Sequence, residues 1–141
     1  MKFFVLISFI LMGCTANKSS VSRYSYKVSE LVSKKGQPIS IKQNQLDNRY
    51  EMYQYEDETY QVDDKRVISK FRSPSDNEKN IQYWRHLLKG EYYKVLADGN
   101  DHSHGALYKL ISHHRGLTIY FNKSSGKVIR IIESLGDYNA L

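Results

Sequence analysis

Two segments of this chain carry apolar residues at helical spacing, and each is followed by a stretch in which apolar and polar residues alternate. The first segment covers about 20–35 and ends before Gly36 and Pro38, which do not continue a helix. The second covers about 76–89 and ends at Gly90. Because a helix stripe needs another element to cover it, the pattern predicts an α+β fold. We expect an antiparallel sheet of several short strands with the two helices packed on it.

The alternating stretches predict strands joined by short polar turns. Residues 39–72 fit three or four strands, with a turn at residues 63–66 and a slip in the alternation near Tyr53 that predicts a bulge or turn. The C-terminal stretches "EYYKVL", "ALYKLISHH", "LTIYF" and "KVIRIIE" predict an antiparallel meander. The segment "GLTIYFNKSSGKVIRII" resembles the closing hairpin of small periplasmic domains, such as PepSY modules and the small lipoprotein of the β-barrel assembly machinery.

The stripe of the second predicted helix contains the only tryptophan, Trp84. An aromatic residue on an apolar helix face predicts a core anchor, and stacking on a ligand is the alternative interpretation.

The N-terminus has the layout of a secretory signal. Met1 and Lys2 form a short basic start, and residues 3–12 are apolar apart from Ser8. As a helix this apolar core would be about 15 Å long, roughly half of the hydrocarbon layer of a bilayer. The segment is therefore expected to direct export rather than to cross the membrane.

The stretch Leu11-Met12-Gly13-Cys14 resembles the lipobox of bacterial lipoprotein precursors. The resemblance implies cleavage before Cys14, which becomes the lipidated first residue of the mature protein and carries acyl chains such as palmitate. Several chains anchor a protein firmly, whereas one chain binds a membrane only marginally. Thr15 stands where an aspartate would favour the inner membrane, so the resemblance favours an outer-membrane location facing the periplasm.

These expectations divide the chain into a signal peptide at 1–13, a flexible tether at 14–20 and a single α+β domain at 21–141. Two other interpretations of Cys14 stay open. An inert buried thiol would need residues 9–20 to be part of the fold, and a nucleophile would need a neighbouring base.

The composition indicates which classes of binding partner the protein favours. With 21 basic and 15 acidic residues, the formal net charge is +6. This charge favours solubility, and it also favours weak attraction to anionic lipid or polysaccharide. The basic residues are scattered, and an envelope location removes nucleic acid as a partner. Because there is only one cysteine, an internal disulfide is excluded and packing alone must hold the domain together.

Four of the five histidines lie between residues 102 and 114. Asp98, Asp101, His102 and His104 form a candidate Zn²⁺ or Cu²⁺ site, because His-x-His in an extended chain places both imidazoles on one side. A solvated turn without metal is the alternative. No other cofactor is expected.

A tyrosine-rich acidic segment lies between residues 50 and 60. Tyrosines beside charges have the composition of a protein interface, so the segment is predicted to recognise a basic partner. Solvated turns on either side of a half-buried strand are the alternative. The candidate interface residues are Tyr50, Tyr53, Tyr55, Glu56, Asp57, Glu58 and Tyr60.

The leading functional prediction is a non-enzymatic, lipid-anchored envelope lipoprotein that binds another envelope protein or a polymer. The sequence contains no nucleophile elbow, Ser-x-x-Lys motif or convincing acid pair, although catalytic groups assembled only by the fold stay open. One alternative is a periplasmic immunity or inhibitor lipoprotein that neutralises a toxin or lytic enzyme. A metal-binding lipoprotein is the second alternative. The sequence does not indicate an oligomeric state.

Overall fold

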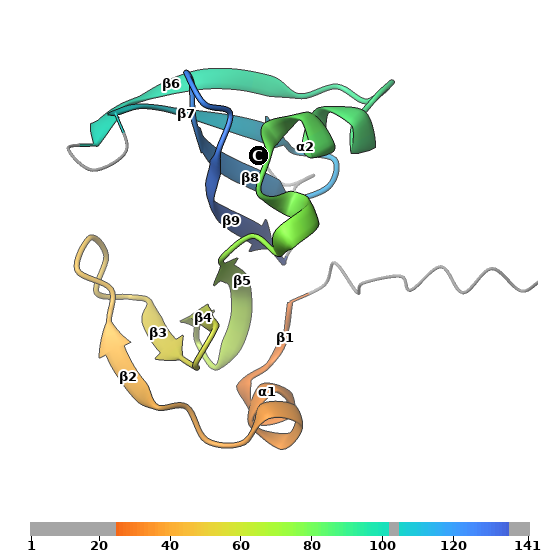
Figure 1. Cartoon of the computed structure of the whole chain (residues 1–141). Helices are drawn as coiled ribbons and strands as arrows, with labels where there is room; N and C mark the ends of the chain where they lie inside the picture. The colour runs from red at the N-terminus through yellow and green to blue at the C-terminus, as the bar shows by residue number, and fades with distance from the viewer. Residues whose placement is uncertain (1–24, 102–104, 136–141) are drawn as a thin grey trace, which may run out of the picture.

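The computed structural model describes residues 25–101 and 105–135, which form one nine-stranded antiparallel sheet and two α-helices (Figure 1). The strand order is β2-β3-β4-β5-β9-β8-β7-β6, and the short strand β1 pairs with β5. This confirms the predicted α+β class. The elements are β1 (Tyr26–Lys27), α1 (Val28–Lys35), β2 (Ser40–Gln43), β3 (Glu51–Gln54), β4 (Glu58–Asp63), β5 (Arg66–Arg72), the 3₁₀ turn η1 (Asp76–Glu78), α2 (Ile81–Leu87), β6 (Lys94–Asp101), β7 (Gly105–Ser112), β8 (Leu117–Asn122) and β9 (Val128–Ser134).

Each helix is followed by a four-stranded meander, and the two meanders meet at their last strands, β5 and β9. In Figure 1, β2 to β5 with α1 form one half and β6 to β9 with α2 form the other. At the seam Ser69 lies opposite Ser134, and Arg72 lies opposite Ile131. The sheet is therefore continuous, and the first strand of each meander, β2 or β6, forms an outer edge.

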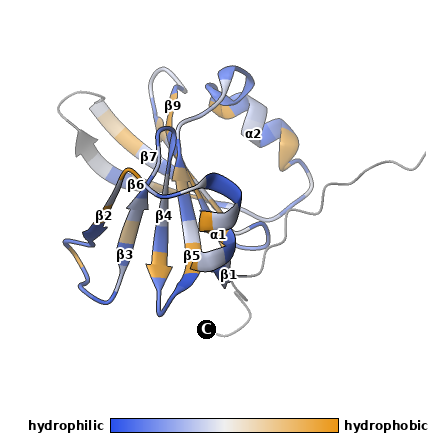
Figure 2. Cartoon of the chain, turned by 90° about the horizontal axis from the view of Figure 1, so that it is seen from below, coloured by the Kyte–Doolittle hydropathy of each residue, from blue (hydrophilic) through white to orange (hydrophobic). Residues whose placement is uncertain are grey.

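Both helices pack on the same face of the sheet. Tyr60 on β4 lies opposite Lys70 on β5, which lies opposite Glu133 on β9, two residues from Ile131. Directly opposite residues and residues two apart share a face. Tyr60 packs in one buried cluster with Leu31 of α1, and Ile131 packs in another with Trp84 of α2. Figure 2 shows α1 in front of β4 and β5.

The core consists of two clusters, one beneath each helix. Trp84 is 3% exposed in the cluster beneath α2, which confirms its predicted place in the core. Its indole N–H donates to the carbonyl oxygen of Glu78 at 3.0 Å. The α1 cluster contains Leu31, Tyr60, Val62, Val67 and Leu135. The α2 cluster contains Ile81, Trp84, Leu88, Leu110, Ile119, Phe121, Val128 and Ile131.

The first helix is shorter than predicted. Of the segment 20–35, residues 20–24 lie outside the described residues, Tyr26 and Lys27 form β1, and α1 begins at Val28. β9 ends opposite Ser69 and leaves the earlier part of β5 without a partner on that side. β1 pairs there, and the amide of Val28 donates to the carbonyl oxygen of Lys65 at 2.9 Å. Pairing with β5 therefore replaces the predicted helix at Tyr26 and Lys27.

The second predicted helix, 76–89, is interrupted. It divides into η1 and α2, separated by Lys79 and Asn80. The carbonyl of Lys79 accepts the amide of Val128 at 2.8 Å, so pairing with β9 replaces helical bonding there. Asn80 then caps α2, because its side-chain oxygen accepts the amide of Gln82 at 2.9 Å.

No helix within residues 25–101 and 105–135 is long and apolar enough to cross a membrane.

Candidate functional site: a cationic cavity beside the β6 edge

The tyrosines of the predicted interface lie mostly against the core. Tyr60 is 2% exposed, and Tyr53 and Tyr55 are half-buried and pack on the cluster beneath α1. The rings of Tyr55 and Tyr60 meet edge to face, with centroids 5.7 Å apart. These contacts place Tyr60 in the core and leave only part of Tyr53 and Tyr55 accessible. Whether the segment binds a partner stays a prediction.

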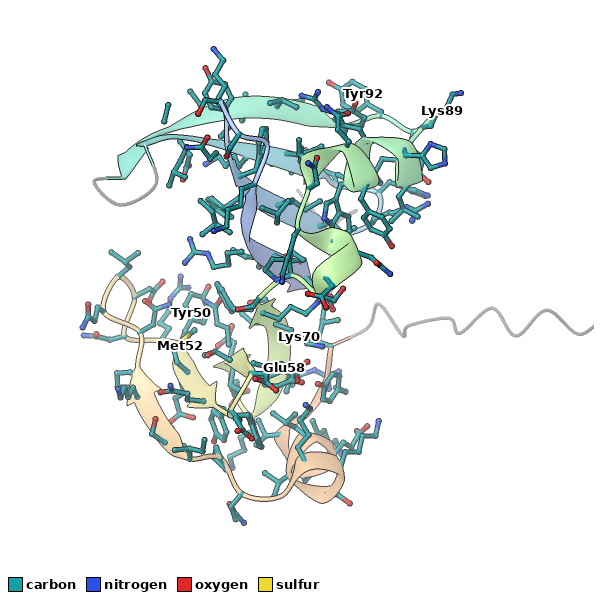
Figure 3. The ribbon with its side chains drawn as sticks, viewed as in Figure 1. Tyr50, Met52, Glu58, Lys70, Lys89 and Tyr92 are labelled. Carbon is teal, nitrogen blue, oxygen red and sulfur yellow. The ribbon has the colours of Figure 1, made fainter. Side chains whose placement is uncertain are left out.

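Glu58 belongs to an ion network beside Tyr60. Lys70 lies 2.5 Å from one of its carboxylate oxygens, Lys35 binds the other, and the Tyr60 hydroxyl donates to Glu58 at 2.6 Å (Figure 3). Burial alone would raise the pKa of Glu58, but the hydrogen bonds from Lys35, Lys70 and Tyr60 outweigh it and lower the pKa to about 2. Burial and the neighbouring Glu58 raise the pKa of Tyr60. This carboxylate therefore connects α1 to the sheet.

Only two of the seven candidate interface residues are exposed. Glu56 and Asp57 are exposed in the turn before β4, beside a shallow surface cavity of about 250 Å³ that Arg130 also lines. Tyr50 precedes β3, and the guanidinium of Arg49 lies 5.2 Å from its ring centroid. The seven predicted residues therefore do not form one continuous exposed face.

The predicted metal-binding residues are only partly described. Asp98 lies at a bulge in β6, and Lys109 on β7 pairs with it at 2.7 Å, so a cation already occupies this carboxylate. Asp101 belongs to β6, but its side chain lies outside the described residues, as do His102, His104 and the predicted lipidation site, Cys14. Among the residues that are described, no group of three or more potential metal ligands occurs. The metal site and the lipid anchor stay predictions.

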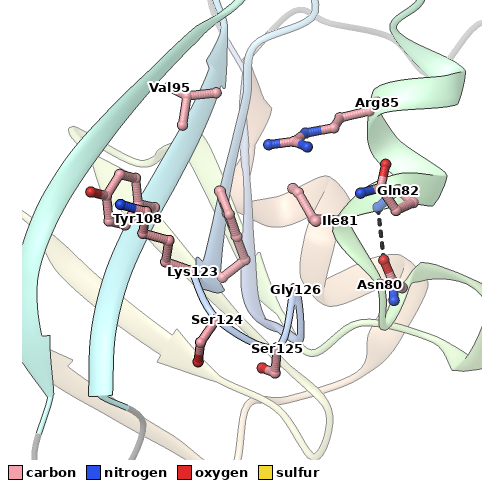
Figure 4. A pocket seen from close by; sticks show the side chains of 11 residues that line it. Asn80, Ile81, Gln82, Arg85, Val95, Tyr108, Lys123, Ser124, Ser125 and Gly126 are labelled. Carbon is pink, nitrogen blue, oxygen red and sulfur yellow. Dashed lines mark hydrogen bonds between the residues drawn. The ribbon is translucent and has the colours of Figure 1, made fainter.

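A cavity of about 310 Å³ opens between α2 and the strands beneath its first turn (Figure 4). Its framework is fixed by backbone bonds, because the amide of Ile81 donates to the carbonyl oxygen of Gly126 at 2.9 Å. Gly126 has a φ of 68°, and a Cβ built there would lie 3.2 Å from Ile81. The β8–β9 loop can therefore lie directly against the start of α2.

Two cations face this cavity. Arg85 points into it from α2, and Lys123 reaches it from the end of β8, with its ammonium 5.0 Å from the ring centroid of Tyr108 (Figure 4). Within residues 25–101 and 105–135, no acidic residue lines the cavity and no carboxylate pairs with either cation. The site therefore has a positive local charge that the described part of the protein does not neutralise.

The rest of the lining combines apolar and hydroxyl groups. Phe121 and Val95 form part of the apolar wall, and Ser124 and Ser125 lie on the rim. Both hydroxyls donate to the side-chain oxygen of Asn122, at 2.7 and 3.0 Å, and this fixes the loop. Such a cavity can hold an anionic group at its cations and an apolar group at its wall.

The amino-acid sequence alone does not indicate this site. Residues 123–126 indicate only a tight connection, and Arg85 lies at the edge of the apolar stripe of the second predicted helix. The two cations are far apart in the sequence, so their proximity depends on how the β8–β9 loop packs on α2. The only local signal is a lysine followed by two serines and a glycine at a hairpin beside a helix start.

No protein-family model matches the chain, and no curated protein matches it. Among solved structures, the chain is similar to an extracellular protein containing an SCP domain from Bacillus anthracis str. Ames, with a TM-score of 0.51 and 12% sequence identity. The match covers 94% of this chain and 50% of that one, so the chain spans half the length of its structural neighbour. At this identity the likeness concerns the fold alone.

Proposed function

We propose that this protein is an exported lipoprotein of the bacterial envelope, anchored through Cys14, whose domain binds an acidic segment of another envelope protein. The observation that carries the binding proposal is the cavity lined by Arg85 and Lys123, with no carboxylate among the described residues that line it. The lipobox resemblance at residues 11–14 supports the anchor. The protein would act by binding and not by catalysis.

An acidic side chain fits the cavity chemically. Arg85 can hold a carboxylate with two parallel N–H bonds, and Lys123 supplies a second, compact charge. The apolar wall at Val95 and Phe121 can cover the methylene groups of the same ligand. Because the backbone bonds at Gly126 already fix the loop, little ordering is required on binding.

The binding proposal is tested with the full-length lipoprotein, purified in detergent and used to capture partners from envelope extract. The test variant carries Arg85→Glu and Lys123→Glu. The control carries Lys42→Glu and Lys89→Glu, which change the net charge equally at exposed positions outside the cavity. A stoichiometric protein partner retained by the control and lost by the test variant supports the proposal. Equal capture by both would contradict it, and capture of an acidic polysaccharide would assign the cavity to a polymer.

The anchor is tested separately with Cys14→Ser. We expect the wild type to incorporate labelled fatty acid and to sediment with membranes, whereas the variant incorporates none. Equal labelling of both proteins would contradict the anchor without affecting the cavity. If the captured partner is a toxin or a lytic enzyme, the inhibitor interpretation replaces the general binding role.

A further inference from the structure

β6 is an edge strand with exposed apolar residues. It stands at the end of the strand order, and among the strands that the structure describes it pairs only with β7. Val95 is 39% exposed and Leu96 is 45% exposed, and all residues from 94 to 99 are exposed. Tyr92, in the segment just before the strand, is 74% exposed (Figure 3). The outer N–H and C=O groups of such an edge are available to another extended chain.

The cavity lies beside this edge. Val95 lines the cavity, and it lies opposite Leu110, a residue buried beneath α2. Directly opposite residues share a face, so the Val95 face of β6 is the face that carries the cavity. A chain added alongside β6 would direct every second side chain to this face. One of those side chains would then lie near Arg85 and Lys123.

We propose that the acidic partner segment binds as an added antiparallel strand on β6 and places one carboxylate between Arg85 and Lys123. The inference rests on the proposed function and specifies its mode of recognition. Main-chain bonds to β6 supply affinity, and the cavity supplies specificity for an acidic residue. In an antiparallel arrangement the start of β6 faces the C-terminal end of the segment, so the acidic residue lies near that end.

The opposite edge of the sheet provides a control within the same molecule. Among the described strands β2 also pairs with one neighbour only; it exposes Ile41, at 52%, and Ile39 just before it is 72% exposed. It has four residues, against eight in β6, and it does not line the cavity. Of these two edge strands, only β6 has exposed apolar residues beside a cationic cavity. This combination favours an acidic extended partner at β6 over pairing with any exposed strand.

The test uses amide exchange followed by NMR on the full-length protein in detergent. The probe is an acetylated and amidated eight-residue peptide of alternating threonine and valine, with one glutamate near its C-terminal end. A matched peptide carries glutamine in place of the glutamate. We expect the acidic peptide to bind about tenfold or more tightly than its match, since it adds a charge-assisted pair. We also expect it to slow exchange of alternate β6 amides and leave the β2 amides unchanged.

The outcomes separate the two proposals. If the acidic peptide binds, loses affinity in the Arg85→Glu and Lys123→Glu variant, and leaves exchange of β6 unchanged, strand addition is overturned while the cavity function stands. If β6 is protected equally by both peptides, the edge binds but the cavity does not select an acid, which overturns the carboxylate placement. Concentration-dependent protection of β6 without peptide would assign the edge to a second copy of the chain and overturn the proposal.

Discussion

Arg72, at the end of β5, binds Glu78 of η1 through two nitrogens, with Nη1–Oε2 at 2.6 Å and Nη2–Oε1 at 2.8 Å. Its third nitrogen, Nε, donates to Glu133 on β9 at 2.6 Å. One guanidinium therefore joins both sides of the seam and the turn that leads into α2. All three side chains are less than a quarter exposed, so solvent screens the interaction only in part.

Arg72→Ala is expected to lower the free energy of unfolding by about 2–3 kcal/mol, because it leaves two half-buried carboxylates without their cation. Urea denaturation followed by circular dichroism measures the change. The control is Arg49→Ala, which removes a similar fork from Asp47 at the surface, where the Arg49 side chain is 73% exposed. We expect Arg49→Ala to leave the urea midpoint nearly unchanged. Equal losses of stability in the two variants would show that burial of the Arg72 ion pairs does not matter.

Acid should destabilise the protein through Glu58 and Glu78. Hydrogen bonds from Arg72 and Ser75 lower the pKa of Glu78 to about 2 despite its burial, and the pKa of Glu58 is lowered to about 2 as well. Both values lie below those of the unfolded chain, so their contribution is complete above about pH 4.5 and is lost as the pH falls toward 2. Urea midpoints across this range should fall, and less steeply in Glu58→Gln than in the exposed control Glu56→Gln. If the urea midpoints of the two variants depend on pH in the same way, Glu58 does not contribute to the acid sensitivity.

Ser112 has a fully buried hydroxyl that has no hydrogen-bond partner within the part of the chain that the structure describes. We expect Ser112→Ala to raise the free energy of unfolding by about 1 kcal/mol, because alanine removes an unpaired polar group. The matched control is Ser69→Ala, at a serine that is 6% exposed and donates to Gln61 at 2.9 Å. That change should lower the free energy by a similar amount, and destabilisation by both would show that Ser112 is paired in solution.

Gly116 closes the turn between β7 and β8 with a φ of 61°, and a Cβ there would lie 2.6 Å from the carbonyl oxygen of Ser134. Gly116→Ala should therefore cost about 2–4 kcal/mol, from left-handed strain and the backbone contact together. Gly90 has a φ of 86° with nothing within 4 Å, so Gly90→Ala should show the conformational strain alone. Thermal unfolding compares the two, and equal effects would exclude the contact as a cause.

The sequence predicted features that depend on local spacing. Trp84 in the core, the four C-terminal strands and the turn at residues 63–66 are confirmed, and Asp64 and Lys65 have the positive φ values of a two-residue hairpin. Ser75 and Glu78 form a capping box, although it begins a 3₁₀ turn and not a long helix. These features follow from side chains a few residues apart, and so they can be seen in a single sequence.

Other features depend on distant segments. The helix is interrupted before α2 where the amide of Val128 donates to the carbonyl oxygen of Lys79. β1 pairs with the part of β5 that lies beyond the end of β9 at Ser69. The alternation around Tyr60 predicts a strand, but it does not indicate which face of the strand α1 covers. Tyr60 was therefore included in the candidate interface although it is buried in the core. Near Tyr53, where a bulge or turn was expected, the structure has the turn between β3 and β4, and the bulge lies between Gln61 and Val62. Each outcome is determined by tertiary pairing that local propensity does not encode.

The seam between β5 and β9 joins residues 59 to 65 positions apart, whereas the strand pairs within each meander are local. Short-range hairpins close quickly, and long-range pairing is slow, so each half is expected to assemble before the seam closes. The only tryptophan lies in the α2 half. Its fluorescence therefore reports on the α2 half of the molecule. An unfolding curve recorded by tryptophan fluorescence would not detect earlier unfolding of the cluster beneath α1.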